Sequence, residues 1–374
     1  MSTTLIFPTL APKCTRRSFV ANLRKKSFAF GTISTVPEHI GTFQYLAVLA
    51  EAMVSMSRFR MTFPHIAPFR FGVQCSRAAN RTEWVDLAKK TEANGFSCLT
   101  MPDHFTDQLA PIPALQTVAD ATSTLRVGAL VWDNDYKHPV VLAKELATID
   151  LLSEGRLEIG LGAGWMVSDY EQSGIAYDTP GVRIDRFIEG LAIIKAAMGD
   201  DPVNHSGTHY NVANYVGMPK PVQRPYPPIL IGGGGKRVLS YAAREADIIG
   251  INGTMTAGVV GPEAISTMTA EAVTEKVNIV INAAGSRLPS IEMNIRSFFV
   301  KVTDDAAGTI DGVAQMIGVT PSMVEETPFA LIGPPSKLIE DLIARRERWG
   351  FSYVIVGAED VDTFAPVVAA LNGK

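Results

Sequence analysis

Short apolar segments alternate with amphipathic helical patterns eight times after residue 68, and this alternation leaves few folds open to the chain. Parallel strands joined by helices form a closed barrel or a doubly wound open sheet, and the open sheet normally uses fewer strands. We therefore expect an α/β fold, a (β/α)8 TIM barrel with insertions. The predicted strands cover residues 69–75, 96–101, 125–132, 156–161, 228–231, 246–251, 291–302 and 351–356.

Capping residues and glycine stops mark the predicted helices. Asn80, with Glu83 three residues later, has the pattern of a capping box, and Gly95 ends that helix. Six prolines break the rhythm in 200–228, where we expect an irregular insertion or a hairpin, and 303–330 is a second insertion of helix or loop. The other helical patterns cover 111–122, 139–155, 182–198, 236–245, part of 262–284, 336–350 and a last segment near residue 371.

Composition excludes several classes of protein. Of the 374 residues, 47% are apolar and 19% charged, which is not the composition of a disordered chain or a coiled coil. The net charge of -4 gives no indication of a nucleic-acid partner. No uninterrupted apolar run reaches about 18 residues, so no membrane span is predicted. Cys14, Cys75 and Cys98 lie too far apart for a disulfide framework or a zinc motif, which favours the reducing cytoplasm.

The first 68 residues differ from the rest because they are rich in Ser and Thr and poor in acidic residues. An Arg16–Arg17 pair suggests a twin-arginine export signal, but basic residues at 24–26 interrupt the apolar stretch that such a signal needs. A transit peptide and an original start at Met61 both stay open. We expect 1–68 to be a poorly ordered N-terminal extension without a catalytic role, and 69–374 to be the barrel domain.

Polar and aromatic residues directly follow the second and third predicted strands. Catalytic groups of barrel enzymes gather at the carboxyl ends of the strands. Asp103 and His104 follow the second strand. A histidine whose pKa is tuned by an acid can exchange a proton near neutral pH, but the two residues can also simply form a hydrogen-bonded pair in a loop. Trp132, Asp133 and Asn134 follow the third and can hold a flat ligand, or supply packing and turn chemistry.

Glycines follow the fourth and fifth strands. Gly162 and Gly164 let a ligand approach the backbone, although their spacing is not the dinucleotide fingerprint. Four glycines at 232–235 precede Lys236 and Arg237 at a helix start, which favours a phosphate site over a plain tight turn.

Two further pairs of residues each have a functional interpretation and a purely structural one. His205 and His209 have metal-ligand spacing, but glycine and proline around them make a helix improbable, and we predict no metal site. Arg183 and Arg186 can clamp an anion or belong to a salt-bridged helix face.

Taken together, five segments resemble the bacterial luciferase-like superfamily, and most of all its deazaflavin (coenzyme F420)-dependent oxidoreductases. They occur in family order and the resemblance covers roughly residues 69 to the end, with 1–68 outside it. The segments are FRFGVQ at 69–74, DHF at 103–105, LLSEGRLEIGLGAGW at 151–165, PKPVQRPYPPILIGGG at 219–234 and AAREAD at 242–247.

The resemblance implies a barrel whose mouth holds coenzyme F420 or, as the alternative, FMN, and which pairs as a homodimer. It implies that His104 is a proton donor beside the redox ring. The sugar-phosphate dehydrogenases of this branch carry a catalytic glutamate where this chain has Trp165, so a sugar-phosphate substrate is not carried over. The implied cofactor-binding residues are Asp103, Trp132, Asp133, Gly162, Ala163, Gly164, Ser168, Gly232, Gly233 and Gly234.

The implied reaction is hydride transfer between C5 of the deazaflavin and a small organic substrate, with an activated C=C or C=N bond reduced and His104 as proton donor. The reverse direction, with an alcohol oxidised and His104 as base, stays open. The alternatives are an FMN-dependent monooxygenase that uses O2 and a separate reductase, and a barrel without catalysis. The segments 166–180, 200–228, 252–262 and 303–330 would set specificity.

Overall fold

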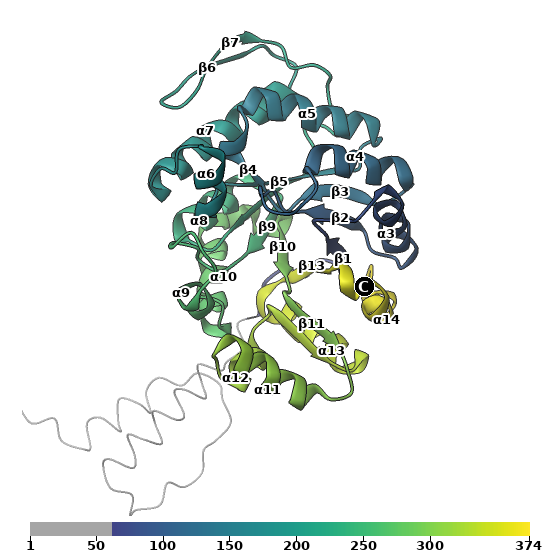
Figure 1. Ribbon diagram of the computed structural model, residues 1–374. Helices are drawn as coiled ribbons and strands as arrows, with labels where there is room; N and C mark the ends of the chain where they lie inside the picture. The colour runs from purple at the N-terminus through teal and green to yellow at the C-terminus, as the bar shows by residue number, and fades with distance from the viewer. Residues whose placement is uncertain (1–61) are drawn as a thin grey trace, which may run out of the picture. The chain divides into compact units, whose positions relative to one another are not determined.

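Eight parallel strands close into a barrel in the computed structural model, which describes residues 62–374 (Figure 1). Each strand pairs in parallel with its neighbours, and β3 also pairs with β5, which closes the ring. The predicted (β/α)8 barrel is confirmed, because each of the eight predicted segments overlaps a barrel strand. The strands are β1 (Arg70–Gln74), β2 (Cys98–Met101), β3 (Arg126–Ala129) continued by β4 (Trp132–Asp133), β5 (Leu157–Gly162), β8 (Ile229–Gly233), β9 (Ile248–Ile251), β10 (Glu292–Arg296) and β13 (Phe351–Gly357).

Helices surround the strands, and their starts and stops follow the capping residues. Asn80 Oδ1 accepts a hydrogen bond from the Glu83 backbone N–H at 3.0 Å, and Glu83 Oε2 accepts one from the Ala79 N–H at 2.8 Å, which confirms the capping box. The helices of the barrel are α3 (Arg81–Ala93), α4 (Pro111–Ala121), α5 (Pro139–Leu152), α6 (Val167–Ser173), α7 (Pro180–Met198), α8 (Lys236–Glu245), α9 (Pro262–Ser266), α10 (Ala270–Ala284), α13 (Pro335–Trp349) and α14 (Val361–Leu371).

Two predicted strands are interrupted. The third strand breaks between β3 and β4, where Leu130 and Val131 bulge toward the barrel mouth. The segment predicted as one strand over 291–302 divides after β10. The Ser297 backbone N–H still bonds to a barrel strand, but the Phe298 N–H bonds to Phe329 O at 2.8 Å, so the chain changes its pairing partner and leaves the barrel.

Two insertions leave the barrel framework. The segment 200–228 contains the antiparallel hairpin of β6 (Val203–Ser206) and β7 (Asn211–Tyr215), which projects beyond α5 and α7 (Figure 1). The second insertion builds a separate two-stranded parallel sheet with two covering helices. Its elements are β11 (Phe299–Val302), α11 (Ala306–Ile317), α12 (Pro321–Glu326) and β12 (Ala330–Gly333).

The predicted N-terminal extension lies mostly outside the described residues. Residues 62–68 are described, and Phe63 is buried, with its backbone N–H bonded to Glu347 O at 2.8 Å. Within residues 62–374, no helix has both the length and the apolarity to cross a membrane.

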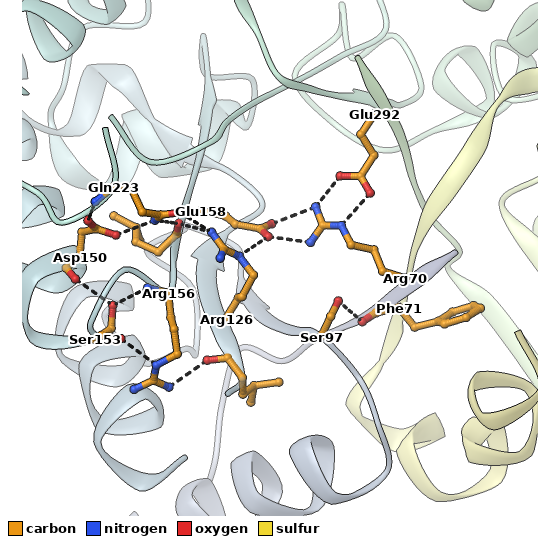
Figure 2. Close-up of polar contacts among 12 residues, drawn as sticks. Arg70, Phe71, Ser97, Arg126, Asp150, Ser153, Arg156, Glu158, Gln223 and Glu292 are labelled. Atoms are coloured by element: carbon orange, nitrogen blue, oxygen red, sulfur yellow. Dashed lines mark hydrogen bonds and ion pairs between the residues drawn. The ribbon is translucent and has the colours of Figure 1, made fainter. Parts of the chain in front are cut away.

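Charged side chains fill the N-terminal end of the barrel (Figure 2). Arg70 donates to Glu158 at 2.6 Å and to Glu292 at 2.7 and 2.6 Å, and Arg126 donates to Glu158 at 2.7 Å. All four side chains come from the first or second residue of their strands, so they form one layer. Above this layer lies an apolar one that includes Tyr353, and the Arg70 guanidinium lies 3.5 Å from the centre of its ring. The two layers close this end of the barrel.

Candidate active site

A cavity of about 350 Å³ opens at the other end of the barrel, where the strands have their carboxyl ends. This is the end at which barrel enzymes carry their active sites. Nine of the eleven predicted site residues line it, namely Asp103, His104, Asp133, Gly162, Ala163, Gly164, Gly232, Gly233 and Gly234.

His104 is oriented by a buried carboxylate. Its Nδ1 lies 2.7 Å from Oδ2 of Asp169, a residue of α6 whose side chain is 1% exposed. The Tyr136 hydroxyl donates to the same oxygen at 2.8 Å, and the Phe105 backbone N–H donates to Oδ1 at 3.2 Å. The Trp165 ring meets the imidazole edge-on, with 5.6 Å between ring centres. Because Nδ1 is taken by Asp169, Nε2 is the nitrogen that His104 can offer to the cavity.

Two carboxyl groups that line the cavity with His104 have raised pKa values. The Asp133 backbone N–H donates to Asp103 at 3.3 Å, and the Tyr170 hydroxyl donates to Asp133 at 3.1 Å. Burial raises the pKa of Asp103 to about 6. Burial, together with the charge of Asp135, raises the pKa of Asp133 to about 7. Both groups therefore carry less negative charge near neutrality than ordinary carboxylates, and an anionic ligand meets less repulsion there.

The glycines after β5 permit close packing as well as ligand approach. A Cβ on Gly162 would lie 2.7 Å from Cγ2 of Val131 in the bulge. Gly164 has φ +74°, and a Cβ there would overlap the Tyr170 hydroxyl and lie 2.7 Å from Oδ2 of Asp133. These two positions are glycine because the bulge and the Tyr170–Asp133 hydrogen bond occupy the space.

One side of the cavity is suited to an anion. The glycines at 232–235 lead into α8, whose first backbone N–H groups have no partner within the helix. A Cβ on Gly235 would meet nothing within 4 Å, so the space in front of the helix is open. Arg183 lines the same cavity from α7, is 3% exposed, and its Nε has no hydrogen-bond partner in the described chain. Arg237 of α8 donates to Gly181 O of α7 at 3.2 Å, which brings the two helix starts together.

Comparison with known proteins assigns the chain to a family. The family model described as luciferase-like monooxygenase matches residues 61–317. The chain belongs to the luciferase-like monooxygenase family. Its match to the family model begins eight residues before the segment in which the sequence alone indicated the resemblance, and the predicted family is confirmed.

The curated relatives and solved structures include flavin and deazaflavin enzymes. The chain is 28% identical over 199 residues to an FMNH2-dependent dimethylsulfone monooxygenase of Pseudomonas putida, covering 50% of this chain and 54% of the relative. It is 29% identical over 174 residues to an F420-dependent glucose-6-phosphate dehydrogenase of Amycolatopsis mediterranei, covering 44% and 51%. The chain thus spans about half the length of these curated relatives.

The coenzyme F420-dependent tetrahydromethanopterin reductase of Methanopyrus kandleri has a similar fold, with a TM-score of 0.66 at 18% identity over 82% of this chain and all of that one.

The residues of the cavity fit a flavin or deazaflavin of the kind that these relatives use. Gly232 keeps one wall free of side chains, since a Cβ there would only touch Val131, at 3.4 Å. The wall beside the bulge therefore carries no side chain at position 232. The start of α8 and the unpartnered Nε of Arg183 supply donors for a phosphate.

Two predicted cofactor-binding residues lie outside the cavity lining. Trp132 is 1% exposed, and its Nε1 has no hydrogen-bond partner within residues 62–374. Ser168 lies on α6 and is half-buried. Their contacts with a cofactor stay predictions.

The structure gives the contacts of the two pairs with open interpretations. Arg186 bonds to Asp135 at 3.0 Å and to Asp178, so it belongs to a salt-bridged helix face, whereas its neighbour Arg183 reaches the cavity. His205 lies in a strand of the hairpin and contacts Glu189 at 3.3 Å. In the described part of the chain, no three His, Cys, Asp or Glu side chains are grouped to hold a metal ion.

Asp169, Asn294 and Arg296 are among the site residues that the sequence analysis missed. Asp169 lies 65 positions from His104, and nothing in the sequence links the two. Asn294 and Arg296 line the cavity from β10. A signal for these two does exist, because Glu292, Asn294 and Arg296 alternate along one strand and place a polar face inside a barrel.

Proposed function

We propose that the chain is an F420-dependent oxidoreductase that transfers a hydride between deazaflavin C5 and a small organic substrate, and that it reduces an activated C=C or C=N bond. The observation that carries the proposal is the His104–Asp169 pair, at 2.7 Å, in a glycine-walled cavity of a luciferase-like barrel. The F420-dependent relative and the F420-dependent reductase of the same fold support the choice of cofactor.

The reduced cofactor would supply the hydride. One atom of the substrate double bond accepts this hydride, and the other accepts a proton, so the substrate gains two electrons and two hydrogens. We assign the proton to Nε2 of His104. Asp169 accepts the hydrogen bond from Nδ1, keeps the ring in one orientation and stabilises the imidazolium that donates the proton.

Other residues would bind and orient. The backbone N–H groups at the start of α8 and the Arg183 guanidinium would hold the anionic part of the cofactor. Val131 and Gly232 would hold the ring flat against the β3–β4 bulge. Fixing both reactants in contact lowers the entropic part of the barrier. Trp165, which contacts the His104 ring, stands where the sugar-phosphate dehydrogenases have their glutamate, so we propose a substrate other than a sugar phosphate.

A second candidate function is an FMN-dependent monooxygenase with a separate reductase. The relative from Pseudomonas putida, which uses FMNH2, favours it. The two functions differ in their need for oxygen, because a deazaflavin does not readily activate O2.

The test is a titration of the full-length protein with F420 and with FMN, followed by turnover with each reduced form in the presence and absence of O2. We expect F420 to bind more tightly and its reduced form to be consumed without oxygen. Consumption of reduced FMN that requires O2 would transfer the assignment to the monooxygenase. If neither cofactor binds, the barrel has no redox role.

We also propose that the chain forms a homodimer. The outer face of α5 exposes Val141 by 50% and Leu152 by 57%, beside an apolar hollow with α4, and a partner helix would cover this face. Light scattering on the purified chain would give twice the chain mass, and a monomer mass at micromolar concentration would contradict the proposal. The predicted cytoplasmic location stays a prediction.

A further inference from the structure

A second cavity, of about 730 Å³, lies at the same end of the barrel and has no role in the proposed function. It is formed over the carboxyl ends of β1, β2 and β13, where Gln74 and Pro102 line it. Arg296 lines both cavities. The second cavity therefore adjoins the candidate cofactor cavity, and a molecule in one can meet a molecule in the other beside this arginine.

The position of Arg296 follows from the alternation along β10. Glu292, Asn294 and Arg296 point into the barrel at three successive levels. Glu292 pairs with Arg70 at the N-terminal end, and Asn294 donates to Tyr353 O at 3.0 Å in the middle. Arg296 lies at the carboxyl end, where the barrel opens into the two cavities.

The guanidinium of Arg296 has incomplete partners. Its Nε donates to Gln74 Oε1 at 3.0 Å and its Nη1 to Ser297 O. Among residues 62–374 no carboxylate lies within ion-pair distance of it, and its Nη2 has no hydrogen-bond partner. Burial lowers the pKa of Arg296, while the charges of Glu359 and Asp360 act in the opposite direction. A half-buried cation with no carboxylate in direct contact is costly, and an anionic ligand in contact with it would offset this cost.

Arg77 also lines the second cavity, but its exposure and its partner differ from those of Arg296. Arg77 has a side chain that is 73% exposed and pairs with Asp107 at 3.4 Å. Its charge is solvated and already has a partner, so it gains little from a ligand. Of these two cations, Arg296 alone combines burial with a free donor edge.

We propose that the second cavity is the substrate pocket and that Arg296 binds a carboxylate group of the substrate. A planar guanidinium with free donors matches a carboxylate, and this contact would place the reacting part of the substrate at the junction of the two cavities. The substrate class is then a small organic carboxylate. This inference rests on the proposed function, because it assigns the first cavity to the cofactor.

The test measures binding to the full-length protein without added cofactor, by calorimetry in a buffer free of other carboxylates. The probe is benzoate, and its neutral counterpart is benzamide. We expect benzoate to bind more tightly than benzamide. We expect Arg296→Gln to weaken benzoate binding tenfold or more and to leave benzamide unchanged. The matched control is Arg77→Gln, in the same cavity, which should leave both affinities within twofold.

A conservative variant keeps the test independent of folding. Arg296→Lys retains the charge but not the paired donors, so its affinity for benzoate should fall between those of the wild type and Arg296→Gln. If Arg296→Gln does not fold, Arg296→Lys carries the test, and an affinity for benzoate equal to that of the wild type contradicts the proposal.

Three results would overturn the inference. The first is equal binding of benzoate and benzamide by the wild type. The second is unchanged benzoate binding in Arg296→Gln. The third is a loss of F420 affinity in Arg296→Gln by the same factor as the loss for benzoate, because the anion of Arg296 would then belong to the cofactor. If neither F420 nor FMN binds the wild type, the proposed function fails, whereas selective binding of benzoate through Arg296 would still be observed.

Discussion

The two ends of the barrel use charged residues in opposite ways. At the N-terminal end, Arg70 and Arg126 lie against Glu158 and Glu292, with donor–acceptor distances of 2.6 to 2.7 Å for the closest contacts (Figure 2). At the carboxyl end, Asp103, Asp133, Arg183 and Arg296 line the cavity, and none of these four forms an ion pair within residues 62–374. Paired charges stabilise a fold only when both partners stay, whereas unpaired ones are available to a ligand.

The electrostatic consequence appears in the pKa values. The guanidinium groups of Arg70 and Arg126 outweigh burial and lower the pKa of Glu158 below its ordinary value. Asp133, at the other end, has no such cation in contact among residues 62–374, and burial raises its pKa to about 7. The difference shows that burial alone does not set the charge of a carboxyl in this barrel. The neighbouring cation decides it.

The largest effect is expected at His104. We predict that His104→Ala lowers turnover about 10²- to 10⁴-fold, the usual contribution of a general acid, while the affinity for the cofactor stays within about threefold. Steady-state kinetics and cofactor titration measure the two quantities. His205→Ala, in the distant hairpin, is the control and should leave turnover unchanged. Unchanged turnover in His104→Ala would remove the proton donor from the proposal.

The next effect is expected at the N-terminal end. Glu158→Ala leaves the guanidinium groups of Arg70 and Arg126 with fewer counter-charges, so we predict a loss of about 3–5 kcal/mol in the free energy of unfolding. Urea denaturation measures it, and Glu359→Ala, an exposed carboxyl at the opposite end, should change it by less than about 0.5 kcal/mol. A loss as small as that of the control would show that the charge layer contributes little to stability.

Asp133 should make the free energy of unfolding depend on pH, in the direction opposite to the dependence that Glu158 gives. Its folded pKa of about 7 lies above its ordinary value of 3.8, so the folded state binds more protons between these values. The stabilising contribution is full below about pH 4 and is lost as the pH rises through 7. We predict that Asp133→Asn removes this loss, on the order of 3 kcal/mol, and makes unfolding free energies at pH 5 and pH 8 more alike. An unchanged difference between the two pH values would mean that Asp133 is ionised throughout.

The smallest change in stability is expected at Gly232. A Cβ there would contact only Val131, at 3.4 Å, so Gly232→Ala should alter the free energy of unfolding by less than about 1 kcal/mol. The added methyl group projects into the cavity wall, and we predict at least a tenfold weaker binding of the cofactor. Equal binding by the variant and the wild type, in a fluorescence titration, would place the cofactor ring elsewhere.

The sequence was sufficient to predict the framework of this protein. Periodicity is a local property, so eight apolar segments separated by helical patterns predict eight strands, and a capping box at Asn80 and Glu83 predicts where a helix begins. Residues at the ends of strands were also predictable, because a parallel barrel brings all carboxyl ends to one face. This is why nine predicted residues meet in one cavity.

Only the tertiary structure decided which side chains become partners. Asp169 reaches His104 from a helix 65 positions away, and Arg296 reaches the junction of the two cavities after the same strand has paired Glu292 with Arg70. Whether a carboxyl is neutral or a guanidinium is free depends on groups that meet across the barrel. Such contacts join residues that are far apart along the chain, so no local pattern encodes them, whereas strand and helix periods repeat within a few residues.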